Sequence, residues 1–226
     1  MDTALYEPSP LALERLEAVT FVAVVGPTAA GKTTLIRRAM QREPSLHLVL
    51  NNTSRARRPD EHEGVDYRFE TREAMIKRIE RGEYVQVAPT LFGDLYATAA
   101  DDYTTDGIAT LPVLADAIPV FRRLPFKKMR TVYVLPPDWD TWQARIALHK
   151  FTPEKRASRM QEAARSLHFA LDDTHTTYVV SREGERATDD FIQAVCDRPY
   201  TPALVADQTI AKDIIHNLLQ CLKKPK

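Results

Sequence analysis

The chain has 226 residues and carries equal numbers of basic and acidic residues, 31 of each. This length suits one compact α/β domain with small insertions, and the apolar content of 44% argues against global disorder. A net charge of zero gives no general attraction to nucleic acid or membranes, so any site for an anion must be built locally.

Two cysteines, Cys196 and Cys221, lie near the C-terminal end. Two widely spaced thiols form neither a disulfide framework nor a metal cluster, and structural cysteines of this kind fit the reducing cytoplasm. The N-terminal sequence lacks the basic and apolar regions of a signal peptide, and no apolar run approaches the roughly 20 residues that span a bilayer. We therefore expect a cytoplasmic monomer or weak dimer that binds neither nucleic acid nor membranes.

The first quarter of the chain alternates strand-like and helix-like segments. Residues 21–25 form a short, continuous apolar run, which is typical of a strand buried on both faces of a parallel sheet. A helix is predicted at 33–42, since Pro44 stops it, and a second strand follows at 46–50. A polar, arginine-rich stretch at 51–67 then predicts a loop with short strands.

The rest of the chain returns to the alternation of strands and helices. A helix is predicted at 71–82, where apolar residues recur at helical spacing and Gly82 marks the end. The other predicted segments are strands at 84–87, near Tyr96, at 108–114, at 131–135 and at 177–181, and helical regions at 140–171, 189–195 and 209–222. Alternating strands and helices predict an α/β fold with a mostly parallel sheet, interrupted at 51–106 by an inserted substrate domain.

One segment matches the phosphate-loop pattern G-x-x-x-x-G-K-[ST] and lies between the first strand and the first helix of this alternation, where the mechanism needs it. Glycines let the backbone fold tightly around an anion, and the amides that follow face the phosphates. The lysine reaches the β- and γ-phosphates, and the Thr33 hydroxyl can bind Mg²⁺. The predicted triphosphate site consists of Gly26, Pro27, Thr28, Ala29, Ala30, Gly31, Lys32, Thr33 and Thr34.

A second segment decides between the families that share such a loop. The loop alone also resembles the start of tRNA prenyltransferases. Residues 53–69 resemble the T-T-R-x-P-R-x-G-E-x-x-G-x-D-Y-x-F stretch of guanylate kinases, which has no counterpart in those enzymes. The matching residues, in register and without a gap, are Thr53, Arg55, Arg58, Glu61, Gly64, Asp66, Tyr67 and Phe69.

The resemblance implies which residues bind the acceptor nucleotide. In guanylate kinases the two arginines and the tyrosine of this stretch hold the acceptor phosphate, which implies this role for Arg55, Arg58 and Tyr67; the planar fork of arginine suits a phosphate. Tyr96 and Thr98 stand where the family has Y-G-[ST] and are further candidate ligands. A strand aromatic packed in the core of the insert is an equally good interpretation of Tyr96.

The family also has a mobile lid with arginines that close over the phosphates. Leu135-Pro136-Pro137 with Trp142 and Arg145 resembles the family's P-P-S-x-x-x-L-x-x-R-L. Ser158-Arg159-Met160 resembles the family's later K-R-L. The resemblance implies that Arg145 and Arg159 act in transfer. Taken without the resemblance, each of the two arginines would be interpreted as a solvated helix residue.

The chain departs from the family at positions that read the base. Asn51 replaces a serine, Gln86 replaces a glutamate, and Ala115, beside Asp116, replaces an aspartate. A carboxylate accepts hydrogen bonds from both N1–H and the 2-amino group of guanine, whereas an amide accepts with one oxygen. The second lid arginine corresponds to His149, with Lys150 beside it. These departures concern guanine specificity more than kinase activity.

The predicted function is transfer of the γ-phosphoryl group from ATP, with Mg²⁺, to a nucleoside monophosphate, with GMP favoured. The resemblance implies a P-loop NTPase core of mostly parallel sheet flanked by helices at 18–50 and 107–200, an acceptor-binding insert at 51–106, a lid at about 140–165 and a helical C-terminal extension at 200–226. Two alternatives stay open: a kinase for another phosphorylated small molecule, such as ribose bisphosphate, and a non-catalytic protein-binding module of the same fold.

Overall fold

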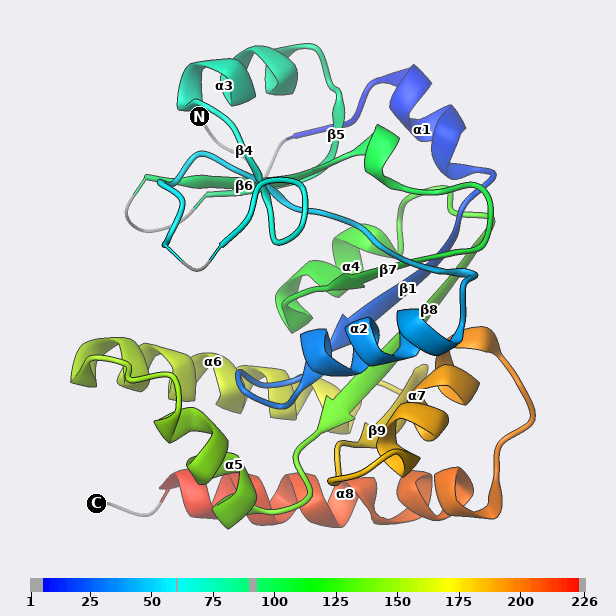
Figure 1. Cartoon of the computed structure of the whole chain (residues 1–226), viewed down its shortest axis with the longest axis vertical. Coiled ribbons are helices and arrows are strands. Elements are labelled where there is room, and N and C mark those ends of the chain that lie inside the picture. Colours follow the sequence, from blue (N-terminus) through cyan, green and yellow to red (C-terminus); the bar gives the residue numbers. More distant parts are fainter. Residues whose placement is uncertain (1–5, 60, 90–92, 224–226) are drawn as a thin grey trace. The chain divides into compact units, whose positions relative to one another are not determined.

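The computed structural model describes residues 6–59, 61–89 and 93–223 (Figure 1). The chain forms two compact units. Unit 1 comprises Met1–Phe21, His47–Leu111 and Val120–Met129, and unit 2 comprises Val22–Leu46, Pro112–Pro119 and Arg130–Lys226. Among the described residues, no helix is both long and apolar enough to cross a membrane.

The larger sheet has five strands in the order β2-β7-β1-β8-β9 and is mostly parallel, with helices flanking it. Strands β8 and β9 run parallel, in register from Thr131 opposite Thr176 to Leu135 opposite Val180. The central strand β1 is buried over nearly its whole length, as its apolar run predicts. The strands of this sheet are β1 (Thr20–Val25), β2 (Leu46–Leu48), β7 (Ile108–Pro112), β8 (Lys128–Leu135) and β9 (Thr176–Val180). The predicted fold class is confirmed.

Unit 2 contains the phosphate loop and, within its described residues, five helices. They are α2 (Lys32–Arg42), α5 (Trp139–Ala147), α6 (Pro153–Asp172), α7 (Arg186–Cys196) and α8 (Pro202–Lys223). Helix α2 packs against α7, and α8 packs against β9, α5 and α6 (Figure 1). The helical region predicted at 140–171 is therefore two helices, and Thr152 caps the second through its side chain.

Unit 1 contains a smaller sheet of four strands in the order β4-β3-β6-β5. Its strands are β3 (Asn52–Thr53), β4 (Arg68–Phe69), β5 (Tyr84–Pro89) and β6 (Leu95–Ala99), and its helices are α1 (Pro10–Leu16) and α3 (Arg72–Glu80). Met75 and Ile79 of α3 and Leu95 and Ala97 of β6 belong to one buried apolar cluster. This core supports β6, with which the short strand β3 of the arginine-rich stretch pairs.

Several elements differ from the prediction. Helix α1 and the short helix α4 (Ile118–Phe121) were not expected, and neither were the 3₁₀ turns η2 (Ala100–Asp102) and η3 (Ala115–Ala117). Strand β7 ends at Pro112 and not at 114, although the Val113 N–H still donates to the Val24 carbonyl of β1 at 3.0 Å. Helix α8 begins at Pro202, well before the predicted start at 209. The last three residues of the predicted C-terminal extension, 224–226, lie outside the described residues.

Candidate functional site

The phosphate loop of unit 2 is shaped by its two glycines. At Gly26, where φ is 144°, an added Cβ would lie 2.3 Å from the Val134 carbonyl oxygen, so no larger residue fits. Gly31, with φ of 97°, is the N-cap of α2, and no side chain in the described part of the chain caps this helix. Helices α1, α3, α5 and α6 are each capped by a side-chain oxygen. The first amides of α2 are thus left to an anion.

Lys32 starts helix α2 and folds back over the loop. Its Nζ donates hydrogen bonds to the carbonyl oxygens of Gly26, at 2.6 Å, and Pro27, at 2.9 Å. Burial lowers the pKa of Lys32 to about 8, while the charge of Glu162 acts to raise the pKa and that of Arg159 to lower it. A bound phosphate would supply the negative charge that favours the protonated ammonium.

Arg145 of α5 is held at the end of β9, beside the phosphate loop. Its two terminal nitrogens donate to the side-chain and backbone oxygens of Ser181, each at 2.7 Å. The same Ser181 hydroxyl donates to the Leu135 carbonyl at 3.0 Å, so the anchor is itself fixed. A Cβ on Gly31 would lie 4.0 Å from Arg145 Nη1 and 3.7 Å from Ser181 Cβ. The arginine therefore borders the loop and is not a solvated helix residue.

Two further side chains connect the loop to the helices that follow β8. Trp142 is fully buried and donates its indole N–H to the Thr28 carbonyl at 2.8 Å. Arg159 of α6 forms an ion pair with Glu162 one turn later, and both charges act on Lys32. The predicted lid segment thus contributes Trp142, Arg145 and Arg159 to the surroundings of the phosphate loop.

Thr33 and Thr34 lie in the first turn of α2 with exposed side chains. A threonine hydroxyl at this position suits Mg²⁺, which takes oxygen ligands and keeps most of them from water and substrate phosphates. Among the described residues no group of three histidine, cysteine, aspartate or glutamate side chains could hold a metal ion. The exposed Thr33 hydroxyl, an oxygen donor at the start of α2, therefore fits a Mg²⁺ ion that is shared with a bound nucleotide.

In unit 1, Arg55 organises a compact cluster. Its guanidinium donates to Glu61 Oε2 at 2.7 Å and, through Nε, to the Tyr96 hydroxyl at 2.8 Å. The group lies 4.8 Å from the centroid of the Tyr67 ring, and the rings of Tyr67 and Tyr96 meet edge to face at 5.9 Å. The hydrogen bond from Arg55 holds the pKa of Glu61 below its ordinary value, and burial raises the pKa of Tyr67. The structure brings three of the predicted acceptor ligands together.

The side chain of Arg58 is more exposed and less tightly bonded than that of Arg55. Its backbone N–H donates to Glu61 Oε2 at 2.9 Å, which fixes the residue at its base. Its side chain is 57% exposed, and its guanidinium stands 3.7 Å from Glu61 Oε1, whereas the Arg55 side chain is 10% exposed. Glu61 therefore organises both arginines and leaves Arg58 able to turn to a ligand.

The predicted base-reading residues lie on or beside the small sheet. Gln86 of β5 pairs in register with Thr98 of β6, and Asn51 directly precedes β3. Thr98 is fully buried and shares a hydrogen bond of 3.0 Å with the Tyr103 hydroxyl, so its own hydroxyl is already engaged. Thr98 contributes to packing, and Gln86 and Asn51 are partly exposed.

The remaining positions at which the chain departs from the family pattern lie elsewhere. Ala115 is buried at the start of turn η3. The neighbouring Asp116 faces Arg165 across 3.7 Å with both side chains largely exposed, so this pair contributes little. His149 stacks on Phe151, with ring centroids 5.2 Å apart.

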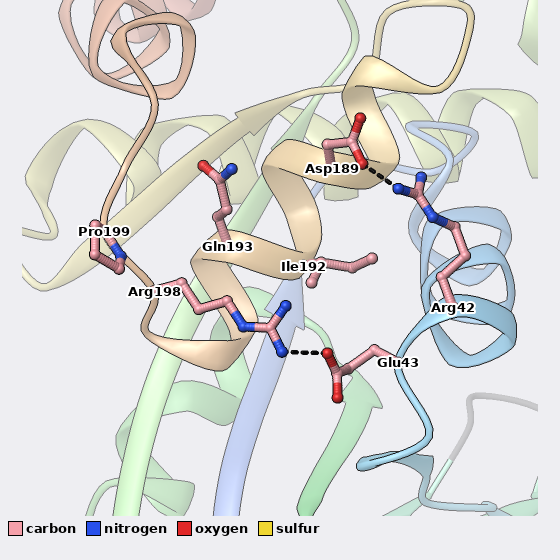
Figure 2. Close-up of a pocket in the computed structure, with 7 residues that line it drawn as sticks. All are labelled: Arg42, Glu43, Asp189, Ile192, Gln193, Arg198 and Pro199. Carbon is pink, nitrogen blue, oxygen red and sulfur yellow. Dashed lines mark hydrogen bonds and ion pairs between the residues drawn. The ribbon is translucent and has the colours of Figure 1, made fainter.

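A separate hollow of about 390 Å³ lies in unit 2 (Figure 2). Each of its arginines is paired with a carboxylate: Arg42 with Asp189 and Arg198 with Glu43 (Figure 2). No predicted site residue lines it; its lining residues are Arg42, Glu43, Asp189, Ile192, Gln193, Arg198 and Pro199. Because no residue of the phosphate loop or of the Arg55 cluster is among its lining residues, we assign it no part in phosphate binding.

Sequence reasoning missed two organising residues. Ser181 anchors Arg145 from a position 36 residues away, and no local pattern marks it. Glu61 was matched to the family stretch without a role, although it bonds to both arginines. The spacing of Arg55, Arg58 and Glu61 within one loop is the signal that could have indicated Glu61.

Comparison with known proteins identifies the family of the chain. The sequence model of the guanylate kinase family matches residues 18–194. The chain is 30% identical over 179 residues to a guanylate kinase of Mycobacterium leprae, covering 77% of this chain and 84% of that one. It is 33% identical over 178 residues to a guanylate kinase of Nocardia farcinica, covering 76% and 90%.

Among solved structures, a guanylate kinase from Anaplasma phagocytophilum superposes with a TM-score of 0.57 at 19% identity, covering 84% of this chain and 86% of that chain. At this identity the superposition supports the fold alone. The family match, the relatives at about one-third identity and the shared fold lead to one conclusion. The chain belongs to the guanylate kinase family and is an enzyme, a nucleoside monophosphate kinase.

Proposed function

We propose that the chain transfers the γ-phosphoryl group of ATP to GMP, giving ADP and GDP. The observation that carries the proposal is the intact phosphate loop. Lys32, the uncapped start of α2 and Arg145 beside Gly31 together form a site for the phosphates of a donor nucleotide. A module that only binds proteins has no need for this arrangement.

The acceptor phosphate is assigned to the arginine–tyrosine cluster of unit 1. Arg58 is largely exposed and free to form a bidentate contact with phosphate. Arg55, held by Glu61 and stacked on Tyr67, presents a fixed positive edge to the same ligand. The Tyr96 hydroxyl already bonds to Arg55 and is a further donor for the phosphate.

Asn51 and Gln86 are the proposed contacts for the acceptor base. Both carry an amide, which donates and accepts hydrogen bonds and can therefore pair with a guanine edge. Thr98 stabilises β6 through its buried hydrogen bond with Tyr103 and does not contact the base. GMP is the favoured acceptor because the curated relatives in Mycobacterium leprae and Nocardia farcinica are named guanylate kinases.

Mg²⁺ is the proposed cofactor, with Thr33 as its ligand from the protein. Bound with ATP, it would supply positive charge that neutralises the charge developing on the phosphates. Lys32 would then hold the β- and γ-phosphates, while Arg145 and Arg159 stabilise the transferring group and exclude water as the helices at 140–165 close. If the helices closed before the acceptor had bound, the phosphoryl group of ATP would pass to water. We therefore expect closure to require both substrates.

The test is ADP release from Mg-ATP against a panel of GMP, dGMP, AMP, CMP, UMP and ribose phosphates, with the full-length chain. GMP or dGMP as the best acceptor is the expected result. A preference for ribose phosphates would replace the acceptor assignment, and ATP binding without transfer to any acceptor would favour a binding module.

The protein is further proposed to be cytoplasmic and to work as a monomer or weak dimer. Cys196 and Cys221 are both free and partly buried, which fits a reducing compartment. Sedimentation over a range of protein concentrations, with and without nucleotides, tests the oligomeric state.

A further inference from the structure

Helix α8 closes the open edge of the larger sheet. Strand β9 is last in the strand order of the described residues, so one side of its backbone has no neighbouring strand among them. Gln208 of α8 fills this place at Tyr178: its Oε1 accepts from the Tyr178 N–H at 2.8 Å, and its Nε2 donates to the Tyr178 carbonyl at 2.7 Å. One side-chain amide thus replaces a strand neighbour at this residue.

The adjacent residue of α8 holds the loop that follows β9. Asp207 is 1% exposed and accepts a hydrogen bond of 2.8 Å from Arg182, whose side chain is 31% exposed. Arg182 directly follows Ser181, the residue that anchors Arg145. Asp207 and Gln208 therefore fix the backbone three residues before Ser181 and the side chain one residue after it.

The same helix contacts the elements that carry the other donor-side residues. It packs against α5, which bears Arg145, and against α6, which bears Arg159 (Figure 1). Its buried apolar residues, Leu204, Ala211, Ile215, Leu218 and Leu219, account for this packing. Covering the core requires apolar residues alone, and it does not explain a buried aspartate and a glutamine directed at β9 and its loop.

We infer that Asp207 and Gln208 are positioning residues for the donor nucleotide, acting through the Arg182–Ser181 segment on Arg145 beside Gly31. Helix α8 lies beyond residue 194, the last residue matched by the family model, so this function belongs to the chain's own C-terminal extension. The inference rests on the proposed function, in which ATP binds at the loop 26–34.

The experiment compares two variants of the full-length chain with matched controls on the same helix. Asp207→Ala and Gln208→Ala remove the contacts, whereas Asp213→Ala and Gln220→Ala change exposed residues of the same types. ATP affinity is read without any acceptor from tryptophan fluorescence, because Trp142 bonds directly to Thr28 of the loop. Steady-state rates then give KM for ATP and for the acceptor separately.

The expected result is an ATP dissociation constant and KM raised about tenfold in both variants, since small misplacements of binding groups are costly. The acceptor KM and both controls should stay unchanged at a temperature well below unfolding. Variants that are folded and bind ATP like the wild type would overturn the inference and leave the proposed function standing. A wild type that does not bind ATP would overturn both.

Discussion

Arg145 is anchored by a neutral residue: both of its hydrogen bonds, 2.7 Å each, go to the hydroxyl and carbonyl oxygens of Ser181. The orientation of the guanidinium is therefore fixed while its charge remains uncompensated by this partner. Arg55 shows the opposite arrangement, because Glu61 neutralises it and raises the pKa of its guanidinium. The first arrangement suits a group that meets the highly charged transferring phosphate, and the second suits a rigidly held contact for the acceptor phosphate.

This relationship predicts the behaviour of Arg145 variants. Arg145→Ala should lower kcat by roughly 10²–10³-fold, since a preorganised cation at the transferring group is lost. Arg145→Lys should recover only a small part of the lost kcat. Lysine cannot form the two hydrogen bonds to Ser181 and contact phosphate at the same time. Initial rates at saturating substrates measure the effect, with the melting temperature as the control for folding. If the kcat of the alanine variant stayed within about threefold of the wild type, Arg145 would have no catalytic role.

Lys32→Met should separate catalysis from stability. Burial holds the pKa of Lys32 at about 8, below its ordinary value, so the charged form is disfavoured by folding at neutral pH. Methionine removes that cost, and we expect an unchanged or higher melting temperature together with a turnover lowered roughly 10³-fold or more. Calorimetry and initial rates provide the two measurements. Near-normal turnover in the folded variant would contradict the assignment of the phosphate loop.

Arg58→Ala should raise the KM of the acceptor far more than that of ATP. Arg58 is largely exposed and is fixed through its backbone, so its truncation removes a ligand contact and leaves the Arg55–Glu61 pair intact. Arg57→Ala is the matched control, since Arg57 is the neighbouring exposed arginine. Steady-state kinetics with each substrate varied in turn test the split. Equal increases for both substrates would count against an acceptor site here.

Glu61→Gln tests the organising role of the carboxylate. The amide keeps one acceptor but loses the charge that pairs with Arg55, so we expect stability to fall by about 1–3 kcal/mol and acceptor KM to rise. The hydrogen bond from Arg55 lowers the pKa of Glu61, so its stabilising effect is present above the unfolded-state pKa and is lost as pH falls through the folded-state value. Urea denaturation of both proteins from pH 7 to pH 3 should therefore show a difference that shrinks with acidification. A difference that is constant over this range would show that charge is not the cause.

The phosphate loop could be predicted from sequence because it depends on local backbone geometry. Only glycine fits at Gly26, because a Cβ would meet the Val134 carbonyl. The backbone geometry therefore fixes the residue type, which is visible in the sequence. The mostly parallel character of the larger sheet followed from the alternation of strands and helices. The anchoring of Arg145 by Ser181 could not be predicted in this way, since it depends on two chain segments that meet only in the folded sheet.

Helix starts were the weakest part of the prediction, although a signal was present. Helices α1, α6 and α8 begin at Pro10, Pro153 and Pro202, each directly after a serine or threonine. Proline at the first helical position after such a cap is a recognised start pattern. For α8 the cap is real: the Thr201 hydroxyl accepts from the Leu204 N–H at 3.1 Å. Reading this pattern would have extended the predicted helix to its true start.

Asp190→Asn should stabilise the protein at neutral pH. Asp190 is almost fully buried on α7, with Asp207 of α8 nearby, Arg186 at 3.5 Å and the Thr201 hydroxyl at 3.4 Å. Burial, reinforced by the charge of Asp207, raises the pKa of Asp190 above its ordinary value. The folded state therefore holds this carboxylate at a cost whenever the pH lies above the folded-state pKa, and asparagine avoids that cost.

The pH dependence follows from the same shift. As pH falls through the folded-state pKa toward about 3.8, the ordinary pKa of an aspartate, the native protein takes up a proton before the unfolded chain does, and the cost is relieved. The advantage of the Asp190→Asn variant in unfolding free energy should thus be largest near pH 7 and fade on acidification. Asp189→Asn serves as the neighbouring control, because it removes a surface ion pair with Arg42 and should cost little. The prediction fails if Asp190→Asn lowers the unfolding free energy at pH 7 and this loss shrinks as the pH falls. The charge of Asp190 would then stabilise the folded state.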